Sequence, residues 1–402
     1  MTVTHEPLAG IRILEIGGYI SLPFATSLLC SLGAEVVKVE KPISGDDFRR
    51  HDNEEGFYFR QFNAGKRSLS LDLKRPESIE LLKALIPHYD VVLENLRPGK
   101  LDAMGLSEAD IREIAPDIVF GQVNGFGDTG PLANRPAYDT IGHAYGGLYS
   151  QFGDEGHPTL AGGLSADQVT GLSTACGVLA ALVGRMKTGR GQNMQTSILE
   201  AVTTLTTDSI TQYFDTGVNP HRTSRHPQAQ NFCVETSSGE FLAIHLSSSQ
   251  KFFEALCRAM GRPDLAVDER FTPYRHREAN YDEFADEVAK VFREKPMDHW
   301  ARVLTEEDVP FAPVLTMSDF VENEQVDHLK LLEPERDGLQ LIRPPWRFDG
   351  ERPHRSQHTP RVGEDSLAVA TEALPAERVD ELVAAGVIFV DPGKASATTE
   401  SA

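Results

Sequence analysis

One carboxylate, Asp167, lies where its surroundings suit covalent chemistry. It follows the small-residue loop AGGLSA (161–166) and comes directly before a long apolar helical pattern. This position predicts an N-cap, because the carboxylate can accept hydrogen bonds from the first backbone amides of the helix. The same amides and the helix dipole would keep the carboxylate ionised, and the small neighbours leave room for a bulky electrophile. Local rules favour the capping role, and nucleophilic catalysis stays open beside it.

Other common catalytic centres find no support in the sequence. The 13 histidines show no H-E-x-x-H spacing, the 4 cysteines form no C-x-x-C pair, and no G-x-S-x-G motif is present. We therefore expect no metal cofactor and no serine hydrolase. The turn at Gly17-Gly18 loosely imitates a dinucleotide-binding turn, but Pro23 and Phe24 stand where G-x-G-x-x-G would need glycine. A nicotinamide dehydrogenase is accordingly disfavoured.

Basic residues gather near the ends of the first predicted strands. In a chain with a net charge of -21, such a cluster would form a local pocket for a phosphate-bearing ligand or a solvated rim, and the residues alone leave both open. Its members are Lys38, Lys41, Arg49, Arg50, Lys66, Arg67, Lys74, Arg75, Arg97 and Lys100. The rest of so acidic a surface would repel nucleic acid and anionic membranes.

The composition predicts a soluble, cytoplasmic protein. Of the 402 residues 40% are hydrophobic and 25% are charged, which is typical of globular domains. The start, MTVTHEPLAGIRILEI, lacks the features of a signal peptide. The longest apolar stretch, 175–183, is far shorter than the roughly 20 residues that span a bilayer.

The elements that would position these residues form an α/β pattern. Over the first 125 residues, short β-rich runs alternate with helical patterns, which predicts βαβ units and a parallel sheet. The predicted strands are 11–16, 35–40, 67–73, 90–95 and 118–123, and the predicted helices are 23–32 and 76–85.

The second half of the chain predicts a smaller, separate domain. A helix from about 168 to 186 is apolar nearly all round and should be buried or interfacial. A hairpin pattern over 232–246 and helical patterns over 249–308 follow a polar connection, and 376–390 predicts a last amphipathic helix. We expect a large domain from 1–213 and 325–391, a linker at 214–231, a small α+β domain at 232–324 and a disordered tail at 392–402.

Several segments occur together in an order that resembles one family. They are PLAGIRILEIGGYISLPFATSLLCSLGAEVVKVEKPISGD, NAGKRSLSLDLK, LENLRPGKLDAMGL, NGFGDTGP, RPAYDTIGHAYGGL, the Asp167 segment and KTGRGQNMQTSILEA. This set is similar to the class III CoA-transferases, the group that contains formyl-CoA transferase, carnitine CoA-transferase and the α-methylacyl-CoA racemases. The resemblance covers residues 7–390.

The resemblance implies a fold, an assembly and a reaction. It implies a Rossmann-like parallel-sheet large domain formed by the N- and C-terminal segments, a smaller α+β domain and an interlocked homodimer. It matches Asp167 to the family's catalytic aspartate, at the start of a D-x-x-x-G pattern that ends at Gly171. The implied enzyme moves CoA from an acyl-CoA to a carboxylic acid through an anhydride and an aspartyl-CoA thioester, with CoA as cosubstrate and without metal or ATP.

The resemblance also implies which residues contact CoA or line its site. Lys74 and Arg97 suit phosphates, while Leu71, Leu73 and Met104 suit an adenine slot. The complete set is Ile20, Ser21, Lys41, Leu71, Asp72, Leu73, Lys74, Asn95, Arg97, Met104 and Tyr138.

Departures from the family pattern narrow the substrate and keep alternatives open. Ile20 replaces the glutamine of formyl-CoA transferase, and 232–246 lacks its glycine tetrad, which argues against formyl-CoA and oxalate. The racemases carry G-H-D where this chain has Ala137-Tyr138-Asp139, and a phenol with a pKa near 10 is a poor base.

An α-methylacyl-CoA racemase is nevertheless the main alternative, because the racemases belong to the same family. A nicotinamide dehydrogenase and a non-catalytic CoA-binding homologue are the further alternatives. His143 is interpreted as a site-wall or core histidine. The donor and acceptor acids cannot be deduced from the sequence.

Overall fold

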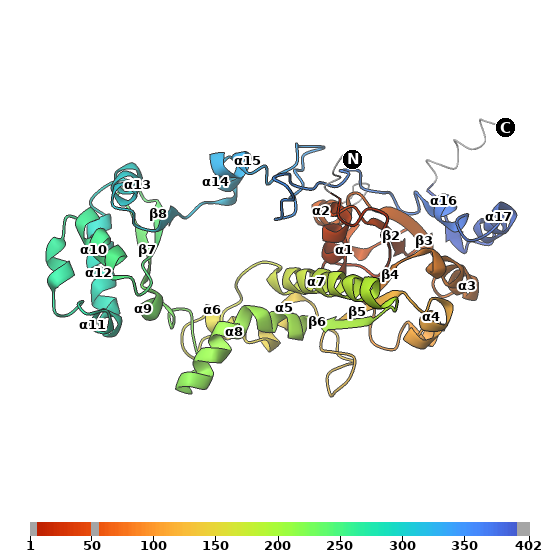
Figure 1. Cartoon of the computed structure of the whole chain (residues 1–402), viewed down its shortest axis with the longest axis horizontal. Helices are drawn as coiled ribbons and strands as arrows, with labels where there is room; N and C mark the ends of the chain where they lie inside the picture. The colour runs from red at the N-terminus through yellow and green to blue at the C-terminus, as the bar shows by residue number, and fades with distance from the viewer. Residues whose placement is uncertain (1–5, 50–55, 392–402) are drawn as a thin grey trace. The chain divides into compact units, whose positions relative to one another are not determined.

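The computed structural model describes residues 6–49 and 56–391, and the predicted tail at 392–402 lies outside this range (Figure 1). The chain divides into two compact units. The first unit comprises residues 1–148, 162–208 and 327–402, and the second comprises 149–161 and 209–326.

The first unit contains a seven-stranded sheet with the order β10-β3-β2-β1-β4-β5-β6. Neighbouring strands from β3 to β6 are parallel, and β10 is antiparallel to β3. The predicted parallel sheet is thus confirmed. The strands are β1 Arg12–Ile16, β2 Glu35–Glu40, β3 Arg67–Leu71, β4 Val91–Glu94, β5 Val119–Asn124, β6 Asn193–Ser197 and β10 Ile388–Phe389.

Helices cover both faces of this sheet, which explains why its strands are apolar on both sides. Two adjacent residues of β1 contact the helices of opposite faces, because successive side chains of a strand point to opposite sides of the sheet. Ile13 packs with α1 and α7, whereas Leu14 packs with α3, α4 and α17. The helices are α1 Ser21–Ser31, α2 Phe57–Asn63, α3 Pro76–Leu85, α4 Glu108–Ile114, α5 Asp139–Tyr145, α7 Ser165–Thr188, α16 Ser366–Ala370 and α17 Ala376–Ala384.

The C-terminal end differs from the predicted helix over 376–390. Helix α17 ends at Ala384, and Gly386 then adopts a φ of 70°, a left-handed conformation that ends helices. Beyond that turn the apolar residues enter the sheet edge, where Ile388 pairs with Leu71 and Phe389 with Ser70. The prediction of one continuous helix was wrong because the glycine interrupts the helical pattern.

Helix α7 is, among the described residues, the one helix long and apolar enough to cross a membrane by length and composition. Its Ala175, Val178 and Leu182 are buried against Leu22 and Leu29 of α1. This packing identifies α7 as a core helix of the first unit, which accounts for its apolar composition.

The second unit has its own core. A three-stranded antiparallel sheet carries Phe232 and Leu242, which pack against Phe253, Phe284 and Trp300 of the helices. The predicted hairpin over 232–246 is confirmed by the pairing of its two strands. The strands are β7 Asn231–Glu235, β8 Phe241–His245 and β9 Phe311–Pro313. The helices within this unit are α9 His226–Ala229, α10 Gln250–Ala259, α11 Tyr274–Ala279, α12 Tyr281–Phe292, α13 Met297–Glu306 and α14 Met317–Val321. Helices α6 Leu148–Phe152, α8 Ile198–Thr216 and α15 Glu324–His328 have residues in both units.

A buried ionic cluster fixes the turn that follows β1. Glu15 accepts hydrogen bonds from Lys38 Nζ at 2.7 Å and Lys66 Nζ at 2.8 Å, and all three side chains are fully buried. Burial alone would raise the pKa of Glu15, but the two ammonium groups lower it to about 2. Lys38 Nζ also lies 2.8 Å from Asp46 Oδ2, and Asp46 Oδ1 accepts the N–H of Tyr19 at 3.2 Å. The cluster therefore determines where the chain turns after the central strand.

Candidate active site

Asp167 is the third residue of α7 and lies three positions beyond the N-cap residue. The helix begins at Ser165, and its N-cap residue Leu164 makes no side-chain cap hydrogen bond. Within 6–49 and 56–391, no group donates a hydrogen bond to the Asp167 carboxylate. The predicted capping role is therefore wrong, because the helix starts three residues earlier than the sequence pattern suggested.

The environment of Asp167 opposes its ionisation. Its side chain is buried, and its backbone N–H donates to Asp139 Oδ1 at 3.0 Å. Burial, followed by the nearby Asp139 charge, raises the pKa of Asp167 to about 7. The prediction that helix amides would hold it ionised is also wrong, since desolvation and the like charge outweigh the helix dipole here.

Gly171, one turn after Asp167, brings α1 close to α7. A Cβ atom at Gly171 would lie 2.6 Å from Ser21 O and 2.8 Å from Phe24 Cδ1. The side chain of any other residue would force the two helices apart. The D-x-x-x-G spacing thus has a physical reason, because it places the Asp167 side chain beside the start of α1.

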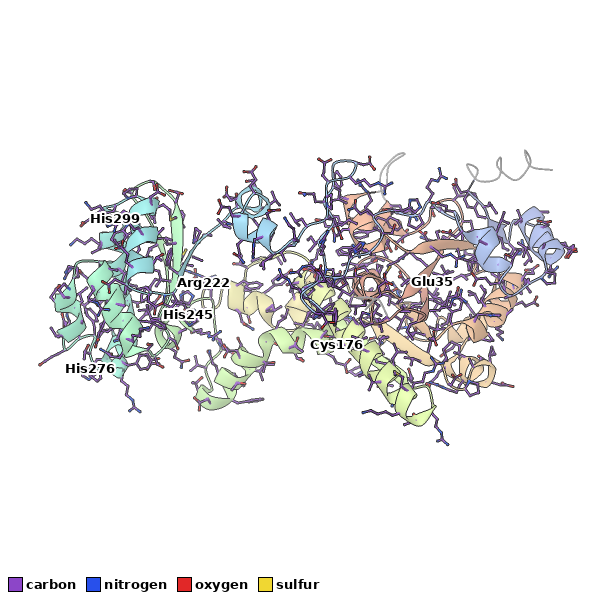
Figure 2. All side chains as sticks on the ribbon, turned by 45° about the horizontal axis from the view of Figure 1, so that its top comes forward. Glu35, Cys176, Arg222, His245, His276 and His299 are labelled. Atoms are coloured by element: carbon purple, nitrogen blue, oxygen red, sulfur yellow. The ribbon has the colours of Figure 1, made fainter. Side chains whose placement is uncertain are left out.

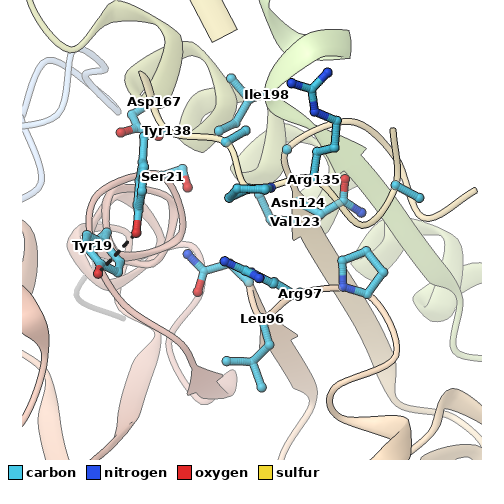
Figure 3. Close-up of a pocket in the computed structure, with 16 residues that line it drawn as sticks. Tyr19, Ser21, Leu96, Arg97, Val123, Asn124, Arg135, Tyr138, Asp167 and Ile198 are labelled. Atoms are coloured by element: carbon cyan, nitrogen blue, oxygen red, sulfur yellow. Dashed lines mark hydrogen bonds between the residues drawn. The ribbon is translucent and has the colours of Figure 1, made fainter. Parts of the chain in front are cut away.

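Asp167 lines a cavity of about 240 Å³ within the first unit, called here the first cavity. In the view of Figure 3, Asp167, Tyr138 and Tyr19 lie on one side and Arg135 on the other. Tyr138 donates a hydrogen bond to Tyr19 at 3.4 Å, and Tyr19 donates to Asp47 at 3.1 Å. The remaining wall comes from segments that follow β4 and β5, where parallel strands end.

A second cavity of about 370 Å³ adjoins the first. The two share Tyr19, Asn95 and Leu96, so together they form one slot at the carboxyl ends of the strands. Of the sequence-predicted site residues, Ser21, Arg97, Tyr138 and Asp167 line the first cavity, Asn95 lines both, and Lys41, Leu71, Asp72, Leu73, Lys74 and Met104 line the second. Ile20 is buried and lines neither, and neither does His143.

Asn95 has a role that its predicted ligand contact did not include. Its Nδ2 donates to Gly18 O at 2.9 Å, and its Oδ1 accepts from Gly18 N at 3.0 Å. A Cβ atom on Gly17 would come within 1.9 Å of Asn95 Oδ1. Asn95 therefore clamps the glycine turn after β1 to the end of β4 and holds the common wall of the two cavities.

The predicted basic cluster separates into paired and available cations. Lys38 and Lys66 belong to the buried ionic cluster, while Arg49 pairs with Glu40 and Arg67 with Glu35, a residue labelled in Figure 2. Arg50 lies outside the described residues. In the part of the chain that the structure describes, four cations of the slot form no ion pair: Lys74, Lys100, Arg97 and Arg135.

Sequence reasoning missed two residues of this site, Arg135 and Asp139. Arg135 lines the first cavity and is the first residue of the matched segment RPAYDTIGHAYGGL, but the sequence analysis assigned it no role. Asp139 was treated only as the end of the Ala137-Tyr138-Asp139 triplet. Its helical spacing of four residues from His143 was the available signal that the two side chains share a face.

Metal chemistry finds no ligand set in the described ranges. No group of three or more His, Cys, Asp or Glu residues there could hold a metal ion. The labelled histidines of the second unit, His245, His276 and His299, lie on β8, α11 and α13 respectively (Figure 2).

The pKa of Asp167 leads to a pH prediction. If Asp167 must be ionised to react, wild-type turnover should rise with pH through about 7. Asp139→Asn removes the second cause of the raised pKa while its amide oxygen can still accept the Asp167 N–H. We expect the acidic limb of the kcat profile to move to lower pH, although not to the pKa of a free aspartate, because burial remains.

The control is Asp282→Asn, which makes the same charge change in the second unit and should leave the profile in place. A profile that stays unchanged or moves to higher pH in Asp139→Asn would show that Asp139 does not act on Asp167 through its charge.

Comparison with known proteins gives one consistent family. A family model described as CoA-transferase family III matches residues 8–366. The chain is similar to the acetyl-CoA:oxalate CoA-transferase of Acetobacter aceti, with 31% identity over 91% of this chain and 95% of the relative. It is also similar to the succinyl-CoA–L-malate CoA-transferase beta subunit of Chloroflexus aurantiacus, with 32% identity over 93% and 97% of the two chains.

Two further similarities agree with that family. The succinyl-CoA:glutarate CoA-transferase of Mus musculus is 30% identical over 95% of this chain and 90% of its own. Among solved structures, a CAIB/BAIF family protein from Brucella suis matches with a TM-score of 0.81 and 28% identity, over 92% of this chain and 100% of that one.

Proposed function

This chain belongs to CoA-transferase family III, and from that premise we propose that it moves CoA from an acyl-CoA to a free carboxylic acid through covalent intermediates on Asp167. One observation carries the proposal. The Asp167 side chain opens into the first cavity, which adjoins a second cavity lined by Lys74 and Lys100 and by Lys41, which pairs with Asp47 at 2.6 Å. The slot thus joins a carboxylate nucleophile to cations that suit the phosphates of CoA.

The proposed reaction uses only the carboxylate of Asp167. An oxygen of Asp167 attacks the thioester carbonyl, so that a mixed anhydride forms and the CoA thiolate leaves. The thiolate then attacks the Asp167 carbonyl, which releases the donor acid as a carboxylate and leaves an aspartyl-CoA thioester. An acceptor carboxylate reverses both steps, and the energy of the thioester is retained throughout.

The positions of the lysines support one orientation of CoA in the slot. Lys74 and Lys100 carry charges without an ion-pair partner among the described residues, and Leu71, Leu73 and Met104 provide apolar surface beside them. We propose that the nucleotide end of CoA occupies the second cavity and that the thioester reaches Asp167 in the first. The implied contact with Ile20 is not part of this proposal, because its side chain is buried outside both cavities.

We propose a dicarboxylic acid as the class of at least one substrate. By their names, the three relatives above act on oxalate, glutarate or L-malate, each of which has two carboxylates. In the first cavity, Arg97 and Arg135 carry charges that no described carboxylate pairs with. One such arginine, Arg135, would hold the carboxylate that does not react.

The racemase alternative lacks a suitable second base in the first cavity. Tyr138 occupies the position matched to the racemase histidine, and His143 lines neither cavity. The named relatives are transferases. Exchange of the α-proton with solvent would reveal a racemase, and the trapping experiment below includes a measurement of that exchange.

The covalent proposal predicts a modified aspartate. Hydroxylamine or borohydride added during turnover should trap a derivative on the peptide that contains Asp167, found by mass spectrometry. Asp167→Asn should lose both the trapped species and transfer, since an amide cannot form the anhydride. Rapid incorporation of deuterium at the α-carbon of a 2-methylacyl-CoA in heavy water, with Asp167 unmodified, would instead identify a racemase.

The dicarboxylate proposal predicts a substrate-dependent effect of Arg135→Gln. Succinyl-CoA and butyryl-CoA have equal carbon chains, and only the first carries a distal carboxylate. Arg135→Gln should lower kcat/KM for succinyl-CoA by about 10- to 100-fold, the value of a lost hydrogen bond to a charged group, and leave butyryl-CoA nearly unchanged.

Lys74→Gln provides the matched control for this measurement. Its proposed phosphate contact is common to all CoA esters, so both donors should lose kcat/KM by the same factor, mainly through KM. Equal losses for the two donors in Arg135→Gln would refute the distal-carboxylate role.

We also propose that the chain acts as an interlocked homodimer. Helix α7 exposes Met186 and Val183, and α8 exposes Phe214 and Tyr213. Exposed apolar side chains in such number favour coverage by another chain. Light scattering should give about twice the chain mass of 44.2 kDa, and a mass of one chain at micromolar concentration would contradict the proposal.

A further inference from the structure

A chain of three close contacts connects a serine to the backbone of the candidate nucleophile. Ser165 Oγ lies 2.6 Å from His143 Nε2. On the other side of the ring, His143 Nδ1 lies 3.0 Å from Asp139 Oδ2. The second oxygen of Asp139, Oδ1, accepts the N–H of Asp167 at 3.0 Å. Each carboxylate oxygen of Asp139 therefore has its own partner.

These contacts join the first turn of α7 to one face of α5. Asp139 and His143 are four residues apart, so they lie on the same side of α5. Ser165 and Asp167 both belong to the first turn of α7, where backbone N–H groups have no partner within the helix. Asp139 satisfies one of these groups from a neighbouring helix, which replaces the missing cap of α7.

The packing between the helices makes this arrangement tight. A Cβ atom on Gly142 would lie 2.2 Å from Ile198 Cγ2 and 3.2 Å from Ala166 Cβ. Glycine therefore permits α5 to approach α7 and α8 at the turn between Asp139 and His143. The His143 side chain is fully buried as a result, with an exposed fraction of 0%.

The two ring nitrogens of His143 face different groups. Nε2 forms a hydrogen bond with Ser165 Oγ, and Nδ1 lies at ion-pair distance from Asp139 Oδ2, whose other oxygen accepts the Asp167 N–H. The imidazole therefore limits the rotation of the Asp139 carboxylate about its side-chain bond.

The arrangement has the residue types of a Ser-His-Asp triad, but its geometry favours positioning. Neither Ser165 nor His143 lines the first or the second cavity, whereas Asp167 lines the first. A fully buried imidazole does not reach substrate in that cavity. The contact chain ends on the backbone of the residue that does.

We propose that His143 is a positioning residue for CoA transfer: it fixes Asp139, which in turn fixes the start of α7 and directs the Asp167 carboxylate into the first cavity. This inference rests on the proposed function, in which Asp167 is the nucleophile. Covalent attack is sensitive to the placement of the attacking atom, and a displacement of about 1 Å can reduce a rate by about 100-fold.

The test compares two substitutions of His143 that differ in their ability to reach Asp139. Asn carries a donor at the position of Nδ1, and Leu fills a similar volume without any donor. We expect His143→Leu to lower kcat by about 10- to 100-fold with KM for acyl-CoA within about twofold. We expect His143→Asn to recover most of that loss. A role in packing alone would predict the opposite order, because Asn leaves the larger void.

A second pair of variants keeps the test decisive if His143→Leu does not fold. Ser165→Ala removes the outer contact of the chain and should lower kcat by a few-fold. Thr174→Val removes another hydroxyl from α7. Thr174 is fully buried, and among the described residues its hydroxyl donates a hydrogen bond to Thr170 O alone, at 2.7 Å. This control should leave kcat unchanged, and a matching loss in both variants would refute the proposal.

Trapping in wild type separates this inference from the function on which it rests. An Asp167 derivative in wild type with an undiminished kcat in folded His143→Leu would overturn the positioning role and leave the transferase intact. Absence of any Asp167 derivative in an active wild type would overturn the covalent mechanism itself. An acyl group recovered on Ser165 would instead identify the three residues as a nucleophilic triad and refute positioning.

Discussion

The buried ion pair between Glu15 and Lys38 is the interaction on which the shape of the site depends. Both groups have left water completely, and removal of one partner from such a pair typically destabilises a protein by about 3–5 kcal/mol because it leaves a buried charge alone. Lys38 also holds Asp46, which accepts the N–H of Tyr19. Tyr19 has a φ of 65°, an unfavourable conformation for a residue with a side chain, and it lines both cavities. The charges in the core thus stabilise a strained turn at the surface of the slot.

The order of the strands explains why the slot forms at this turn. The sheet runs outward from β1 to β2 and β3 on one side and to β4, β5 and β6 on the other. Connections that diverge at neighbouring strands leave a crevice beyond their carboxyl ends, which is where open α/β sheets bind ligands. Asn95 crosses this crevice by clamping Gly18, and α7 closes it because Gly171 allows α1 to approach. The crevice is a general property of the fold, and the close contacts at Gly18 and Gly171 give it the shape of the slot in this chain.

The sequence predicted local order well and long-range partners poorly. The parallel sheet followed from β-rich runs such as EVVKVE, and Asp167 and Gly171 stood out through their spacing in a resembled family. Lys38 and Lys66 were grouped with phosphate-binding candidates, although Glu15 inside the apolar run IRILEI already required a buried cation nearby. Asn95 and Gly18 are 77 residues apart, and no local rule predicts that pairing. Local propensity also placed the start of α7 too late, which produced the incorrect N-cap assignment for Asp167.

The raised pKa of Asp167 is consistent with a group that reacts by losing its charge. A carboxylate that is buried beside Asp139 is less stable as an anion, and its greater basicity makes it a stronger nucleophile. An acyl anhydride or a CoA thioester on the same oxygen or carbonyl is neutral, so its formation removes both the desolvation penalty and the repulsion from Asp139. The two physical causes that oppose the free carboxylate therefore favour the covalent states of the proposed cycle. Because Asp139 exerts this repulsion while it also accepts the Asp167 N–H, its orientation affects both the ionisation energy and the direction of the Asp167 carboxylate. The buried His143 is in direct contact with the other oxygen of Asp139.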